Sequence, residues 1–115
     1  MAEWKITSLA VGELAANCWL LINEEQKEAL VFDPGDEAKQ IQACAEQYDA
    51  RICHILLTHG HSDHMGGAEA LKGLTGAPIY ALQEEEALLL DGVKNLSAFI
   101  HHRGITVQAD VLLTD

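Results

Sequence analysis

The chain has 115 residues, 49% of them hydrophobic, and a formal net charge of −11. This length predicts one domain, residues 1–115, with enough apolar side chains for a core. The negative charge repels phosphate backbones and disfavours nucleic acid as a partner. The sequence has no apolar run of about 18 residues, which excludes a helical membrane span. It also lacks a basic start followed by an apolar segment, so we expect a cytoplasmic protein.

Three strands are predicted at the start of the chain, over residues 5–11, 17–22 and 28–32. Because the connections between them are short, they predict an antiparallel meander. The turn Asp33-Pro34-Gly35-Asp36 then ends the sheet segment, since Pro and Gly favour a tight turn there. We expect Asp36 to cap the helix that follows.

Helices and strands alternate beyond this turn. Ile41, Cys44, Ala45 and Tyr48 recur at helical spacing and predict a helix over 37–48. The next segment, 52–58, is apolar at most positions and predicts a strand covered on both faces. Further on, the pattern predicts a helix over 67–74, a strand over 79–81 and a helix over 83–90.

The fold class predicted from this order is α/β, with a mixed sheet flanked by helices. Within the last helix, Glu84-Glu85-Glu86 is interpreted as a solvated helix start. Residues 93–104 are expected to form a loop or a broken helix, and 105–113 to hold one or two weak strands.

The segment with the strongest chemical signal follows the apolar strand and reads Thr58-His59-Gly60-His61-Ser62-Asp63-His64-Met65-Gly66-Gly67. Within six positions it holds four residues of metal-ligand type: His59, His61, Asp63 and His64. Imidazole and carboxylate suit zinc, and also iron or manganese. Alternate residues of a loop that leaves a strand point to the same side, so His59 and His61 can share one ion. Asp63 and His64 can then hold a second ion nearby.

Other candidate ligands carry less weight. His54 precedes His59 by five residues of strand, roughly 16 Å, and belongs to the other end of that strand. His101-His102-Arg103 can bind a metal or an anion, but an exposed polar cluster is the favoured interpretation. Asp110 and Asp115 have no supporting pattern. The odd set of cysteines, Cys18, Cys44 and Cys53, is interpreted as buried free thiols.

The pattern His-x-His-x-Asp-His after a hydrophobic strand resembles the signature of the metallo-β-lactamase superfamily. Asp33-Pro34-Gly35 looks like the family's upstream aspartate turn, which helps to order the metal site. Ala16-Asn17-Cys18-Trp19-Leu20-Leu21 and Asn95-Leu96-Ser97 resemble segments of its glyoxalase II-like (hydroxyacylglutathione hydrolase-like) members. The resemblance spans the chain but matches only the N-terminal half of the family's αββα four-layer sandwich, which is built from two similar halves.

This resemblance implies a zinc-dependent hydrolase. His59 and His61 would bind the first of two ions, and Asp63 and His64 the second. A metal-bound hydroxide would attack a carbonyl, most plausibly that of a thioester such as an acyl-glutathione. Asp63 would be catalytic as well, because it would orient the hydroxide and accept its proton.

The family completes its site with three further ligands from the second half, and these have no counterpart here. We therefore expect a truncated hydrolase that acts far more slowly than a full-length relative. One alternative is a non-catalytic half-domain that binds one metal ion or none and covers its open sheet face by forming a homodimer. Another is a different branch of the superfamily, with a β-lactam or phosphodiester substrate.

Overall fold

The structure, a computed structural model, describes residues 4–12, 16–58, 60, 62–95 and 104–114, with the backbone alone for Ser62 and Asp63. Its elements in chain order are β1 (Trp4–Val11), β2 (Ala16–Asn23), β3 (Glu28–Phe32), α1 (Ala38–Gln47), β4 (Arg51–Leu57), α2 (Ser62–Met65), α3 (Ala68–Thr75), β5 (Ile79–Leu82), the 3₁₀ turn η1 (Gln83–Glu85), α4 (Glu86–Leu89) and β6 (Val111–Leu113). None of the helices in the described ranges is long and apolar enough to cross a membrane.

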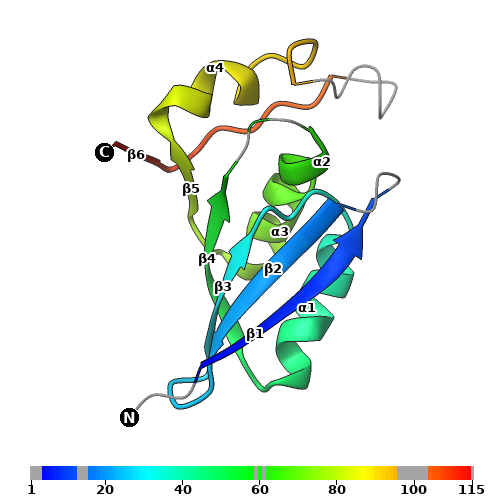
Figure 1. Ribbon diagram of the computed structural model, residues 1–115, viewed down its shortest axis with the longest axis vertical. Helices are drawn as coiled ribbons and strands as arrows, with labels where there is room; N and C mark the ends of the chain where they lie inside the picture. Colours follow the sequence, from blue (N-terminus) through cyan, green and yellow to red (C-terminus); the bar gives the residue numbers. More distant parts are fainter. Residues whose placement is uncertain (1–3, 13–15, 59, 61, 96–103, 115) are drawn as a thin grey trace.

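One mixed sheet organises the fold (Figure 1). The strands lie in the order β1-β2-β3-β4-β5-β6, so each is hydrogen-bonded to its neighbour in the chain. β1, β2 and β3 pair antiparallel, whereas β4, β5 and β6 each join their predecessor in parallel. The predicted meander and the predicted mixed sheet are both confirmed. The carboxyl ends of β3, β4 and β5 therefore meet at one edge of the molecule, where sites form in open α/β sheets.

Helices α1 and α3 pack on one face of this sheet and close the core (Figure 1). The predicted stripe of α1 faces it, with Ile41, Cys44 and Ala45 buried and Tyr48 half-buried. Strand side chains on the same face are buried too: Cys18, Leu20, Ile22, Ala29, Val31, Ile55, Leu57, Ile79 and Ala81. Alternate strand residues fill this core because successive side chains of a strand point to opposite faces.

The opposite face of the sheet, which we call the open face, carries accessible apolar side chains. Trp4 is 54% exposed, Ile6 70% and Trp19 44%. In β4, Leu56 is half-buried on this face and His54 stacks near Tyr80, with ring centroids 5.5 Å apart. The prediction that residues 52–58 form a strand covered on both faces is therefore wrong for the described residues. An apolar run cannot tell a covered face from one left open.

A β-bulge interrupts the pairing of β3 with β4. Ala29 pairs with Ile52, but Leu30 pairs with His54, so Cys53 is the additional residue. The Cys53 thiol donates a hydrogen bond to the Glu28 carboxylate at 3.1 Å. Ile52 and Ile55 are consequently both buried, although they lie three residues apart.

The start of α1 differs from the prediction. The residue before the helix is Glu37, in a left-handed conformation with φ 58°, and its side chain makes no capping bond. The Asp36 carboxylate accepts a hydrogen bond from the Glu37 N–H at 2.7 Å, but Asp36 lies one residue before the capping position, which is Glu37. The Glu37 carboxylate instead accepts one from the Gly12 N–H at 2.9 Å. The left-handed residue turns the chain after Asp36 and so displaces it from the capping position.

Short elements were the hardest to predict. The predicted helix 67–74 is α3, and Gly76, in a left-handed conformation with φ 74°, ends it. α2 was not predicted, because four residues are too few for a periodic pattern. The predicted helix 83–90 is divided into η1 and α4. Of the segment 105–113, only its last three residues form a strand in the described part of the chain.

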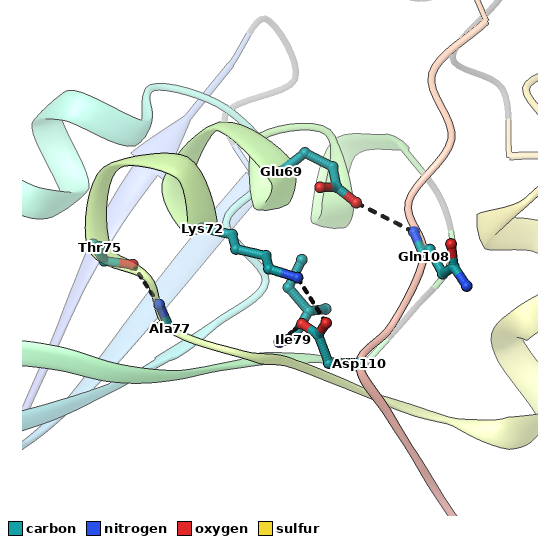
Figure 2. Close-up of polar contacts among 7 residues, drawn as sticks. All are labelled: Glu69, Lys72, Thr75, Ala77, Ile79, Gln108 and Asp110. Carbon is teal, nitrogen blue, oxygen red and sulfur yellow. Dashed lines mark hydrogen bonds and ion pairs between the residues drawn. The ribbon is translucent and has the colours of Figure 1, made fainter.

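Polar contacts from α3 hold the incoming segment before β6, as Figure 2 shows. The Lys72 ammonium lies 2.6 Å from the Asp110 carboxylate, which also accepts a hydrogen bond from the Ile79 N–H at 2.7 Å. The Gln108 N–H donates to the Glu69 carboxylate at 3.3 Å. Asp110 therefore joins α3, β5 and the segment that leads into β6.

We expect Asp110→Asn to lower the melting temperature at neutral pH and to have little effect in acid. Lys72 and the Ile79 N–H hold the pKa of the Asp110 carboxyl below its ordinary value. A carboxyl with a lowered folded pKa stabilises the fold above its unfolded pKa, and this contribution is lost as pH falls through the folded pKa. Thermal unfolding between about pH 7 and pH 3 tests this, given the ordinary pKa of about 3.9 for Asp. An equal loss of melting temperature at both pH values would contradict it.

Candidate metal centre

The four predicted ligands follow β4, at the edge where parallel strands end. His59 and His61 lie outside the described residues. Asp63 is placed by its backbone in α2, and His64 is described in full. Among the described side chains, no three His, Cys, Asp or Glu residues form a group that could hold a metal ion. The ligand set as a whole therefore stays a prediction, and the described residues around it show how the site is supported.

Asp33, in the turn after β3, is the polar centre of this support. It is buried, with 6% of its surface exposed, and adopts φ 57°. Its carboxylate accepts hydrogen bonds from the Thr58 N–H, at 2.7 Å, and from the Thr58 hydroxyl. The same carboxylate lies 3.3 Å from Nδ1 of His64. One side chain thus connects the end of β3, the end of β4 and α2.

Contact with a carboxylate is one of the common ways in which a metal-binding histidine is oriented. Since Nδ1 of His64 faces Asp33, a metal ion would bind this ring through Nε2. The arrangement fits the predicted role of His64. It also supplies a physical reason for the aspartate turn that the resemblance assigned to the metal site.

Gly67 allows the turn at Asp33 and the start of α3 to approach closely. Its N–H donates to the Pro34 carbonyl at 2.8 Å. A Cβ atom on Gly67 would lie 2.7 Å from that carbonyl oxygen and 3.0 Å from backbone atoms of Asp36. Only glycine fits here without movement, so Gly67 has a packing role.

Two residues of this site were missed in the sequence. Thr58 is adjacent to the motif, and a hydroxyl at the end of a strand could have indicated a contact with the aspartate turn. Glu85 accepts a hydrogen bond from the Gly60 N–H at 3.0 Å, although Glu84-Glu85-Glu86 was interpreted as solvated. No sequence pattern distinguishes Glu85 from its neighbours, because the contact joins residues 25 positions apart.

Two of the alternative ligands, His54 and Asp110, are described and have other contacts. His54 lies on the open face beside Tyr80, which agrees with its rejection. Asp110 is paired with Lys72. His101, His102, Arg103 and Asp115 lie outside the described residues.

Asn95 is fully buried, and its amide group donates to the carbonyls of Leu88 and Ile105, at 2.9 and 2.8 Å. It therefore fixes the end of α4 to the segment that returns toward β6. Leu96 and Ser97, the rest of the resembling segment, lie outside the described residues.

The cysteines are free thiols, as predicted. Cys18 and Cys44 are buried, whereas Cys53 is only half-buried at the bulge, so the predicted burial is wrong for Cys53. Burial raises the pKa of the Cys18 thiol to about 12, and the nearby charge of Asp33 adds to the effect. Burial also raises the pKa values of Cys44 and Cys53. The thiolate is the reactive form, so none of the three has the character of a nucleophile.

The mixed sheet, the aspartate turn and the histidine-rich loop define a known class of protein. The chain belongs to the metallo-beta-lactamase superfamily, whose family model matches residues 11–113. It is 32% identical to the hydroxyacylglutathione hydrolase GloC of Haemophilus influenzae, over 96% of this chain and 56% of that protein. It is 36% identical to a protein named probable metallo-hydrolase YqgX, from Bacillus subtilis, over 93% of this chain and 48% of that protein.

Solved structures agree on the fold. The crystal structure of BLEG-1, named a B3 metallo-beta-lactamase, has a TM-score of 0.86 at 33% identity and covers 96% of this chain and 54% of that chain. TTHA1623 in a di-iron-bound form shares the fold at 24% identity, with a TM-score of 0.72 and 93% and 54% coverage. The chain spans about half the length of the relatives it matches, which fits the predicted N-terminal half of the four-layer sandwich.

Proposed function

We propose that the chain is part of a metal-dependent hydrolase that cleaves a thioester, such as an acyl-glutathione. The observation that carries the proposal is Asp33, buried at the carboxyl end of β3 and 3.3 Å from His64 in the predicted ligand cluster. Relatives named hydroxyacylglutathione hydrolase support the thioester over the alternatives.

His59 and His61 would hold one ion, and Asp63 and His64 a second. Zinc is the proposed metal, with iron or manganese as alternatives, because all three accept imidazole and carboxylate ligands. When bound, such ions lower the pKa of a water molecule and polarise the carbonyl under attack. Asp63 would orient that water and accept its proton. Asp33 would keep the His64 ring in place, while Thr58 fixes the Asp33 carboxylate through two hydrogen bonds.

The test is metal-dependent hydrolysis by the purified chain. After loading with zinc, iron or manganese, we expect bound metal and thioester hydrolysis that a chelator abolishes, faster than hydrolysis of a β-lactam or a phosphodiester. The rate should fall far below that of full-length GloC, because this chain spans only 56% of that protein's length. Absence of bound metal, or preference for either other substrate, would refute the proposal.

The proposed compartment is the cytoplasm, because three free thiols suit a reducing environment. The proposed partner is a small-molecule substrate rather than nucleic acid, which the charge of −11 disfavours.

The open face supports a second candidate function, a half-domain that self-associates. Trp4, Ile6 and Trp19 are large apolar side chains exposed on one sheet, and a pocket of about 400 Å³ lies among Ile6, Trp19 and Phe32. Contiguous exposed apolar surface of this kind usually marks an interface. Since the family sandwich has two similar halves, a second copy of this chain is the proposed occupant.

We expect the purified chain to be a dimer by light scattering and Ile6→Asp to shift it to monomer, because a buried charge without a partner is costly at an interface. Leu74→Asp is the matched control: Leu74 is 42% exposed, but it lies on α3 on the helical side of the sheet. A monomeric wild type, or equal effects of the two variants, would contradict this arrangement.

A further inference from the structure

We propose that Glu85 is a positioning residue for the metal-binding loop, which it holds at Gly60, between the predicted ligands His59 and His61. The proposal rests on the proposed function and assigns to it a residue outside the motif. Oε1 of Glu85 accepts a hydrogen bond from the Gly60 N–H at 3.0 Å. Glu85 belongs to η1, after the neighbouring strand β5, so the contact crosses the sheet edge where the site lies.

Packing reinforces this hydrogen bond. Gly60 is buried, and a Cβ atom placed on it would lie 2.6 Å from Cβ of Leu88 and 3.1 Å from the Glu85 carbonyl oxygen. The backbone of the loop therefore rests directly against η1 and α4, at a distance that only glycine permits. The small residue between the two histidines is required by this contact.

The surface against which Gly60 rests is itself fixed. Leu89 of α4 is buried, with 1% of its surface exposed, and its carbonyl accepts a hydrogen bond from the Val107 N–H at 2.8 Å. The Leu88 carbonyl accepts one from the buried Asn95 amide at 2.9 Å. A backbone held by both a hydrogen bond and packing loses less conformational entropy when the neighbouring ligands bind an ion, so the ion binds more tightly.

The Glu85 side chain can act because it is long enough to hydrogen-bond the Gly60 N–H, or because its negative charge attracts a metal ion. Two substitutions separate these effects. Glu85→Gln keeps the length and an acceptor oxygen but removes the charge. Glu85→Asp keeps the charge but is one methylene shorter. If Glu85 positions the loop, Glu85→Asp should weaken Co²⁺ binding about tenfold, the lower end for residues that orient ligands. Glu85→Gln should stay within about threefold of the wild type.

Glu84→Gln is the matched control, since Glu84 is exposed on the same turn and the substitution removes the same charge. Co²⁺ affinity is measured by its visible absorption, alongside the melting temperature of the metal-free chain. The proposal is overturned if both Glu85 variants bind equally, or if Glu85→Gln is the weaker binder, which would indicate attraction by charge.

Amide hydrogen exchange in the metal-free chain separates this proposal from the proposed function. We expect the Gly60 N–H to be protected in the wild type and in Glu85→Gln, and to exchange faster in Glu85→Asp. Absence of Co²⁺ binding by the wild type would refute the proposed function alone. Unchanged exchange in Glu85→Asp would refute the role of Glu85, whatever the metal result.

Discussion

Replacing Asp33 by alanine is expected to destabilise the metal-free chain by roughly 3 kcal/mol, because hydrogen bonds to a buried charge contribute about 1.5–3 kcal/mol each. The substitution removes the acceptor of the Thr58 N–H and hydroxyl and leaves His64 without its carboxylate. The carboxylate that these groups contact is buried and His64 is half-buried, whereas Thr58 is exposed, so water can replace only part of the lost bonds. Urea unfolding in the presence of a chelator measures the change.

Asp49→Ala is the matched control for this prediction. Both aspartates adopt φ 57°, a left-handed conformation that alanine tolerates less well, so both variants carry the same backbone penalty. They differ in burial, since the side chain of Asp49 is 81% exposed and that of Asp33 is 9% exposed. Asp49→Ala also removes an exposed ion pair with Lys27, 2.8 Å long, which contributes little to stability in water. The difference between the two variants therefore measures mainly the contacts of Asp33. Equal losses of stability would show that those contacts contribute little.

The double substitution of His59 and His61 by alanine should abolish measurable binding of the first ion, a loss of at least about a hundredfold in affinity. A zinc ion held by so few protein ligands cannot keep its affinity when two are removed. Zinc titration against a competing chelator provides the measurement. Hydrolysis of an acyl-glutathione should fall with it.

Two controls make this result specific. His54→Ala removes an imidazole from β4, the strand before the motif, on the open face beside Tyr80, and should leave zinc affinity unchanged. The pair His101→Ala and His102→Ala tests the competing ligand cluster. If that second pair lowers the affinity as much as the first, the ligand assignment made from the motif is incomplete.

Repeating features of the sequence predicted the fold well. Alternation located β1 and an apolar run located β2, while the stripe Ile41, Cys44 and Ala45 located α1 with its buried face. These features arise from local geometry, in which side-chain direction repeats every two or 3.6 residues. The order of strands followed from short connections, which keep neighbours in the chain adjacent in the sheet.

The features that could not be predicted from the sequence depend on contacts between residues that are distant in the chain. Glu37 enters the left-handed region before α1, beside Gly12 of the β1 turn, and so Asp36 is not the cap. Glu85 resembles any glutamate of an exposed turn until Gly60 is brought against it. Thr58 and Asp33 likewise meet only because β3 and β4 end side by side.

The bulge at Cys53 has a consequence for the site as well as for the core. Successive side chains of a strand point to opposite faces of the sheet. One additional residue therefore moves every later side chain of that strand to the face opposite the one it would otherwise occupy. Because the bulge at Cys53 shifts the alternation, Leu57 points into the core and is buried. Thr58, the next residue, is then in contact with Asp33. Deleting Cys53 would therefore point each later residue of β4 to the wrong face. The bulge near the start of β4 therefore decides the direction in which the chain leaves the end of this strand and enters the segment with the predicted ligands.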